Sequence, residues 1–140
     1  MANKNTNKTF YFNEVDVKRE ENPHGLMDFE LVTENVLKLT IDGTTDLEKS
    51  SISLNKKDIT FPNVIEWDIV NESLHRFPLH VEIFDEQGKT LSSFWMTLQG
   101  LFTNNAIFKQ IPEKTQKIVL TCHRKHMIDK TATLTITSKN

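Results

Sequence analysis

The 140-residue chain contains four glycines, at positions 25, 43, 88 and 100, and no two of them are close together in the sequence. Loops that cradle phosphate groups need clustered glycines, because their backbone must approach the ligand closely. The chain therefore lacks a phosphate-binding loop and a dinucleotide-binding fingerprint. No serine stands in a G-x-S-x-G motif either, which excludes the nucleophile elbow of the α/β-hydrolases.

Cysteine and long apolar runs are also scarce. Cys122 is the only cysteine, so the chain forms no internal disulfide. No stretch of 18 residues is apolar throughout, which predicts no membrane span. The first ten residues are polar and lack the apolar core of a signal peptide. We expect no cofactor, and these features leave the compartment open.

No charge of one sign dominates, because the formal net charge is -2. A global field that attracts nucleic acid or membranes is thereby excluded. The charges are nevertheless uneven: residues 1–104 hold 10 Lys and Arg against 17 Asp and Glu, whereas residues 105–140 hold 7 against 2. The favoured interpretation is that acidic and basic strands pair in the fold. An exposed basic strip for an anionic partner is the alternative, and it requires these cations to cluster.

What the chain does have is alternation of apolar and polar residues. In residues 64–94, two alternating runs at 65–69 and 79–83 are separated by a polar connection, and a turn at 85–88 follows. Period-two alternation interrupted by Asn, Ser, Pro, Asp and Gly predicts antiparallel strands with one buried and one solvated face. Runs at 27–31 and 37–41 predict a hairpin that turns at 33–35. A single helix over 26–39 is the rival interpretation, which the β-branched residues disfavour.

About eight or nine short strands follow from this pattern, spaced as in an all-β sandwich. We predict an immunoglobulin-like sandwich of two antiparallel sheets as one domain over residues 9–140, after a disordered lead-in or linker at 1–8. A first strand is expected at 10–17 and a loop at 18–25. The expected core residues alternate in the strongest strands: Trp67, Ile69, Val81, Ile83, Phe94, Ile118, Leu120 and Leu134.

The segment from Cys122 to His126 offers one thiol and two imidazoles within five residues. Structural zinc sites usually draw paired ligands from two segments, and here only one segment is present. Cys122 is also in phase with the apolar residues before it, which predicts a buried thiol. Neighbouring strand residues point to opposite faces, so His123 cannot readily serve as a base for that thiol. We expect a buried cysteine followed by an exposed basic turn, with no metal site.

Aromatic residues supply the candidate interaction surface: Phe84, Trp95 and Phe102. If Phe94 and Met96 face the core, Trp95 points outward, where an indole can stack on a sugar or anchor a partner protein. The favoured interpretation gives Trp95 no binding role: both faces of this stretch are buried, or Trp95 covers a sheet edge.

Residues 77–89, PLHVEIFDEQGK preceded by Phe77, follow Asn71-Glu72-Ser73 and resemble a hairpin common in bacterial immunoglobulin-like domains. Residues 108–120 are similar to the closing segment of one such group. That group comprises the extracytoplasmic β-sandwich domains of membrane-anchored anti-sigma-factor-like proteins of Gram-positive bacteria. The chain departs from these proteins by lacking their membrane helix and cytoplasmic part. The resemblance implies a sandwich fold, an extracytoplasmic location and no catalytic residues. The chain also resembles a small bacterial intracellular proteinase inhibitor with a similar sandwich.

We therefore predict a non-enzymatic binding or sensing module whose partner is a protein. Two alternatives remain. A proteinase inhibitor should present an extended exposed loop, for which residues 99–105 are the candidate. A carbohydrate-binding module should show two or more coplanar exposed aromatic rings on one sheet face. An enzyme, which ranks last, would gather at least two titratable groups in a pocket.

Overall fold

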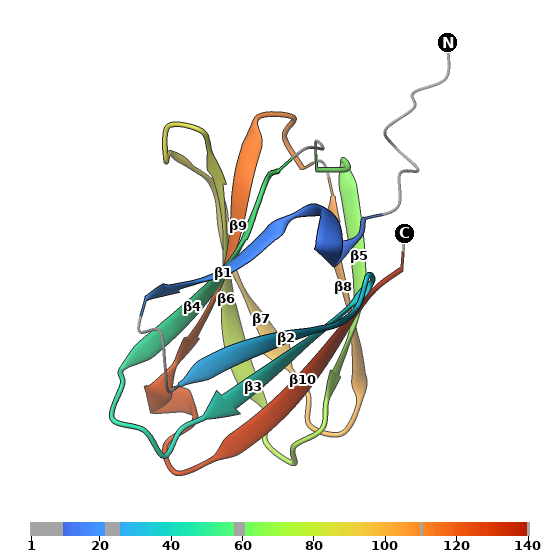
Figure 1. Ribbon diagram of the computed structural model, residues 1–140. Helices are drawn as coiled ribbons and strands as arrows, with labels where there is room; N and C mark the ends of the chain where they lie inside the picture. The colour runs from blue at the N-terminus through green and yellow to red at the C-terminus, as the bar shows by residue number, and fades with distance from the viewer. Residues whose placement is uncertain (1–9, 22–25, 58–60, 110, 140) are drawn as a thin grey trace.

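The computed structural model describes residues 10–21, 26–57, 61–109 and 111–139, and the structural statements below concern these residues. They form ten strands, which build two antiparallel five-stranded sheets, and two 3-10 turns. Sheet A has the order β1-β4-β9-β6-β7 and sheet B the order β2-β3-β10-β5-β8. Figure 1 shows the sheets as two layers that face each other. No helix in this part of the chain is long and apolar enough to cross a bilayer.

The strands of sheet A are β1 (Asp16–Glu21), β4 (Lys49–Asn55), β9 (Thr115–His123), β6 (Phe77–Asp85) and β7 (Thr90–Leu98). The strands of sheet B are β2 (Met27–Thr33), β3 (Val36–Asp42), β10 (Thr131–Ser138), β5 (Val64–Asn71) and β8 (Thr103–Lys109). The two 3-10 turns are η1 (Phe12–Glu14) and η2 (Arg124–His126).

The prediction of an all-β sandwich of two antiparallel sheets is confirmed. The immunoglobulin-like strand order is not confirmed. Without β1 and β2, the sheets read β4-β9-β6-β7 and β3-β10-β5-β8, which is the double Greek key of a jelly roll. The β2–β3 hairpin turns after Thr33 as predicted, so the rival helix over 26–39 is wrong. The expected lead-in at 1–8 lies outside the described residues.

Within the described residues, the structure has ten strands where about eight or nine were expected, and the first of them is displaced along the chain. The expected first strand at 10–17 opens instead with η1, and β1 occupies part of the segment expected to be a loop. Its sequence, DVKREE, has one apolar residue and therefore no alternation to recognise. Such a strand is tolerated because it lies at the edge of sheet A and pairs only with β4. β8 likewise begins at Thr103, within the candidate inhibitor loop at 99–105.

The core lies between the sheets, where inward side chains of both layers meet. Seven of the eight predicted core residues are buried, and Phe94 is partly buried against the same cluster. Trp67 is fully buried, and its ring lies 5.0 Å from Phe108, 5.7 Å from Phe12 and 6.3 Å from Phe10, measured between ring centroids. Only 37% of the residues are hydrophobic, so the core is built from few side chains. Large aromatic rings supply much of its contact area.

At one end of the sandwich, the β3–β4 connection packs against the segment that contains η2. The backbone N–H of Gly43 donates to the carbonyl of Lys130 at 2.7 Å, and the N–H of Arg124 donates to the carbonyl of Glu48 at 2.8 Å. A Cβ atom on Gly43 would lie 1.6 Å from the carbonyl oxygen of Met127. Only glycine allows this approach, and the approach fixes the position of η2 on sheet A.

Replacing Gly43 by alanine should therefore push η2 away from the β3–β4 connection. We expect Gly43→Ala to lower the free energy of unfolding by about 1–3 kcal/mol, the usual cost of overpacking. Urea unfolding followed by tryptophan fluorescence measures it. Asp46→Ala, an exposed position in the same connection, is the matched control and should stay within about 0.5 kcal/mol of the parent. Equal stability of Gly43→Ala and the parent would contradict the close packing.

Candidate functional site

The outer face of sheet A carries an exposed indole. Trp95 lies on β7 and points away from the core, with 51% of its surface exposed. Of the two forms of the favoured interpretation, burial of both faces is therefore wrong, whereas Trp95 does lie on an edge strand. His80 lies directly opposite Trp95 in the β6–β7 register, and the two ring centroids are 4.5 Å apart with an interplanar angle of 34°.

Two more imidazoles come from the end of β9 and from η2. The ring of His123 lies 5.6 Å from that of Trp95, and the ring of His126 lies 6.1 Å from it in an edge-on arrangement. The two imidazole centroids are 6.4 Å apart. We call Trp95, His80, His123 and His126 the Trp95 platform. None of its histidines was predicted to meet Trp95, because the meeting depends on strand order and on η2.

Both ring nitrogens of His80 have a polar neighbour. Its Nε2 lies 2.9 Å from Ser93 Oγ, and its Nδ1 lies 3.8 Å from Glu82 Oε1. Alternation along β6 and β7 places all three residues on the outer face, beside the indole. The ring of His80 is thereby fixed in orientation against Trp95.

The pKa of His123 lies below its usual value of 6.5, first because the ring is partly buried. The positive charges of Lys125, His126, Lys49 and His80 lower it further. His123 therefore resists protonation in the folded protein.

A shallow pocket of about 310 Å³ adjoins the platform. Its lining consists of Glu48, His123, Arg124, Lys125 and Ile128. The Nε of Arg124 is buried and has no hydrogen-bond acceptor within the described residues. A buried N–H without an acceptor is unfavourable, so this guanidinium is incompletely satisfied by the protein itself.

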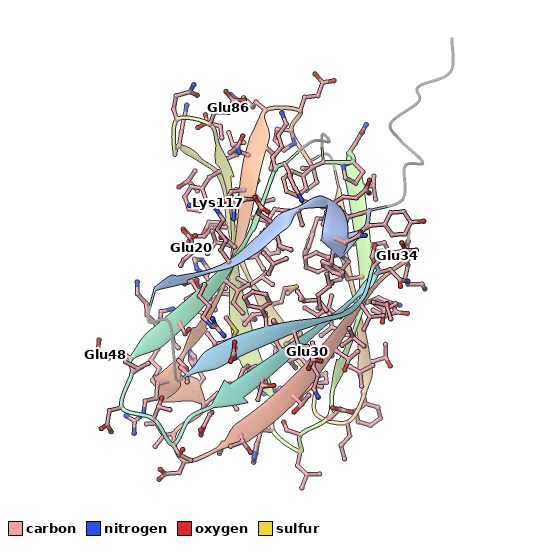
Figure 2. All side chains as sticks on the ribbon, in the orientation of Figure 1. Glu20, Glu30, Glu34, Glu48, Glu86 and Lys117 are labelled. Atoms are coloured by element: carbon pink, nitrogen blue, oxygen red, sulfur yellow. The ribbon has the colours of Figure 1, made fainter. Side chains whose placement is uncertain are left out.

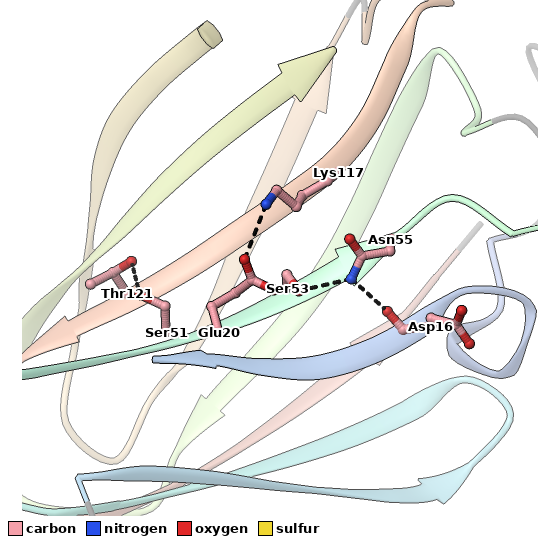
Figure 3. Close-up of polar contacts among 7 residues, drawn as sticks. All are labelled: Asp16, Glu20, Ser51, Ser53, Asn55, Lys117 and Thr121. Carbon is pink, nitrogen blue, oxygen red and sulfur yellow. Dashed lines mark hydrogen bonds and ion pairs between the residues drawn. The ribbon is translucent and has the colours of Figure 1, made fainter. Parts of the chain in front are cut away.

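On the other half of the outer face, over β1, β4 and β9, the polar side chains form hydrogen bonds with one another (Figure 3). Lys117 Nζ lies 3.0 Å from Glu20 Oε1, while Ser53 Oγ donates to Glu20 Oε2 at 2.8 Å. Asn55 Nδ2 donates to Ser53 Oγ at 2.8 Å. Partial burial would raise the pKa of Glu20, but Ser53 and Lys117 outweigh it, so that pKa lies below 4.5. The polar groups here satisfy one another and leave little for a ligand.

The three residues of the predicted interaction surface do not form one patch. Phe84 shares the outer face of sheet A with Trp95, but its register partner is Thr90, so the two lie about four residues or 13 Å apart along the strands. Lys117 Nζ lies 5.5 Å from the centroid of the Phe84 ring and covers it. Phe102 is 70% exposed in the connection between β7 and β8. Trp95 is the aromatic ring of this set that lies uncovered on a sheet face.

Cys122 is buried and points into the core, as predicted, while His123 lies on the outer face. Burial raises the pKa of the Cys122 thiol to about 12. Among the described residues, no group of three or more His, Cys, Asp or Glu side chains is placed to hold a metal ion.

No protein-family model matches the chain, and no curated protein sequence matches it. Solved structures do resemble it. PfGH50B aligns with a TM-score of 0.67 at 12% identity over 93% of this chain, and the agarase AgWH50C with 0.60 at 13% over 89%. A variant of the family 29 carbohydrate-binding module CBM29-2, complexed with cellulohexaose, aligns with 0.58 at 10% over 94%.

The lengths of the matched proteins differ. The chain spans 22% and 23% of the two larger chains but 86% of the CBM29-2 chain. At identities of 10–13%, these similarities show the fold alone, a β-sandwich. They do not bear on the resemblance to the anti-sigma-factor-like domains, which stays a prediction.

The electrostatic surroundings of His123 can be tested by NMR titration. We expect its pKa below 6.5, and Lys125→Ala should raise that pKa because a nearby positive charge is removed. Lys114→Ala, in the connection between β8 and β9, is the control and should leave it unchanged. Since the folded pKa is the lower one, the stability from neutral His123 is present above pH 6.5 and is lost as the pH falls through the folded pKa. A His123 pKa above 6.5 would refute this arrangement.

The burial of Cys122 predicts low reactivity. At pH 8 a disulfide reagent such as DTNB should modify the folded protein at least about 100-fold more slowly than the urea-unfolded chain, because the thiolate is the reactive form. The absorbance of the released thiol measures both rates. One rapidly modified thiol in the folded state would show that Cys122 is accessible.

Proposed function

We propose that this protein is a non-catalytic carbohydrate-binding module that binds its ligand on the outer face of sheet A at the Trp95 platform. The observation that carries the proposal is the half-exposed indole of Trp95, set on a polar sheet face with an imidazole 4.5 Å away. The apolar face of a sugar ring stacks on an aromatic ring, and its hydroxyl groups need donors and acceptors at the edge. His80, Ser93 and Glu82 supply such groups beside the indole.

The structural similarities support this function over the protein partner predicted from the sequence. Two of the similar CBM29-2 variants are complexed with cellulohexaose and with mannohexaose, respectively. Each aligns over at least 90% of this chain, and this chain in turn spans 86% of the first and 79% of the second. The match is thus to whole modules of similar size.

A carbohydrate-binding module was expected to show two or more coplanar exposed aromatic rings, and the Trp95 platform does not show them. Phe84 is covered by Lys117, so one indole is left to stack on a sugar. A single stacking platform favours weak binding, with a dissociation constant in the range of about 0.1–1 mM. Recognition then depends on the polar groups around Trp95 more than on stacking alone.

Trp95→Ala should weaken glycan binding by at least about tenfold, because the variant removes the stacking surface. Affinity electrophoresis through gels that contain soluble polysaccharides measures the loss. Phe102→Ala removes a ring of greater exposure outside the sheet face and is the matched control. Equal retardation of Trp95→Ala and the parent by every polysaccharide that retards the parent would exclude this platform. An unretarded parent would exclude the function.

A second candidate function is contact with a protein through two adjacent loops. Leu74, Leu101 and Phe102 are 79%, 58% and 70% exposed. The loops touch, because a Cβ on Gly100 would lie 2.6 Å from the carbonyl oxygen of Leu74. The proteinase-inhibitor alternative has less support, since the connection between β7 and β8 is confined to residues 99–102. An accessory role outside the cytoplasm stays a prediction.

A further inference from the structure

Three permanent cations lie around the Trp95 platform. Lys49 on β4 is the register partner of His123 on β9, so both side chains leave the same face of sheet A. Arg124 and Lys125 follow His123 directly in η2 and line the adjoining pocket. The basic residues that cluster in sequence after Cys122 are thus joined by Lys49 in space.

Two carboxylates are in contact with this site. Glu82 lies beside His80 on β6, and Glu48 lines the pocket together with the two cations Arg124 and Lys125. Figure 2 shows the other labelled glutamates elsewhere: one is beside Lys117, one is in the distant β6–β7 turn and two are on the β2–β3 side, namely Glu20, Glu86, Glu30 and Glu34. The charges that act on the pKa of His123 are all positive.

The pocket and the platform share His123, whose ring centroid lies 5.6 Å from that of Trp95. The pocket volume of about 310 Å³ accommodates a carboxylate or sulfate group. Its lining offers the guanidinium of Arg124 together with the ammonium group of Lys125. Hydrogen bonds from such charged donors to an anion are about twice as strong as neutral ones.

Resting on the proposed carbohydrate-binding function, we propose that the ligand is an acidic glycan. One sugar ring stacks on Trp95, and a carboxylate or sulfate group of the glycan enters the pocket lined by His123, Arg124 and Lys125. Neutral sugars use the indole but bring no counter-charge to the cations of the pocket. The cations of η2 therefore determine the preference for an acidic glycan over a neutral one.

Binding of an anion should also depend on pH. The groups that face His123 are Lys49 from β4, His80 and Glu82 from β6, Lys125 and His126 from η2, and Glu48 from the β3–β4 connection. An anion beside His123 favours the protonated form of its imidazole. Affinity for an acidic glycan should therefore rise as the pH falls from 8 to about 5.5, a range in which a carboxylate with a pKa of about 4 stays ionised.

The test uses the full chain and isothermal titration calorimetry. The probes are an oligogalacturonate, a sulfated galactan oligosaccharide, neutral cellulohexaose and double-stranded DNA, each at pH 5.5 and pH 8 in 50 mM salt. We expect at least one acidic oligosaccharide to bind about tenfold more tightly than cellulohexaose, with the preference growing at pH 5.5. The two acidic probes distinguish carboxylate from sulfate.

Charge reversal at the pocket separates this inference from the platform itself. Lys125→Glu should weaken binding of the acidic oligosaccharide by about tenfold and leave binding of the neutral one unchanged. Lys114→Glu, an exposed position at the opposite end of sheet A, is the matched control and should change neither. Trp95→Ala should weaken binding of both. Lys125 is exposed, so its replacement should not disturb folding.

Two results would overturn the inference while leaving the proposed function intact. One is Trp95-dependent binding of neutral and acidic oligosaccharides with equal affinity. The other is an acidic preference that Lys125→Glu does not change. DNA binding equal to that of the acidic glycan and insensitive to Trp95→Ala would reveal a general polyanion surface, which refutes the acidic-glycan inference. No binding of any oligosaccharide would refute both the inference and the proposed function.

Discussion

The register of β6 between β7 and β9 is the constraint on which the rest of the structure depends. Leu79, Val81 and Ile83 are buried, and the same alternation turns His80 and Phe84 to the outer face. A slip of one residue would expose the buried set and bury the imidazole. Burial of the apolar side chains of β6 therefore fixes the position of His80 opposite Trp95. The packing of the core and the geometry of the site are thus determined by opposite faces of β6.

The outer face of sheet A divides into two halves with different chemistry. Over β1, β4 and β9, Glu20, Ser53 and Lys117 satisfy one another and leave no large open surface among the described residues. Over β6, β7 and η2, aromatic and cationic groups lie together around the indole of Trp95. The difference arises from β1 at the edge of sheet A, whose Glu20 side chain reaches Ser53 on β4 and Lys117 on β9. A ligand that needs both an apolar ring and charged donors finds them in the second half.

Alternation in the sequence was enough to predict the sandwich and most of its core, but it did not decide the direction of Trp95. It misplaced β1, because that strand has a single apolar residue and therefore no alternation to recognise. The platform could not be predicted for a different reason. His123 and His126 are local to each other, but their meeting with Trp95 requires β6 between β7 and β9, and no local pattern encodes that order. The one local hint was the outward phase of His80.

The uneven charge of the chain is distributed in two ways in the fold, and they correspond to the two interpretations of the sequence. Lys117 pairs with Glu20 at 3.0 Å, and Lys139 lies 3.6 Å from Asp68, so part of the basic C-terminal quarter does neutralise acidic strands. The cations of η2 are placed differently: Gly43 lets this turn pack against the β3–β4 connection, and the turn holds its basic side chains next to an exposed indole. Charge pairing thus describes the cations on the strands, whereas clustering of like charges describes the cations of η2. The clustered part is the one that the proposed acidic glycan contacts, through the pocket lined by His123, Arg124 and Lys125.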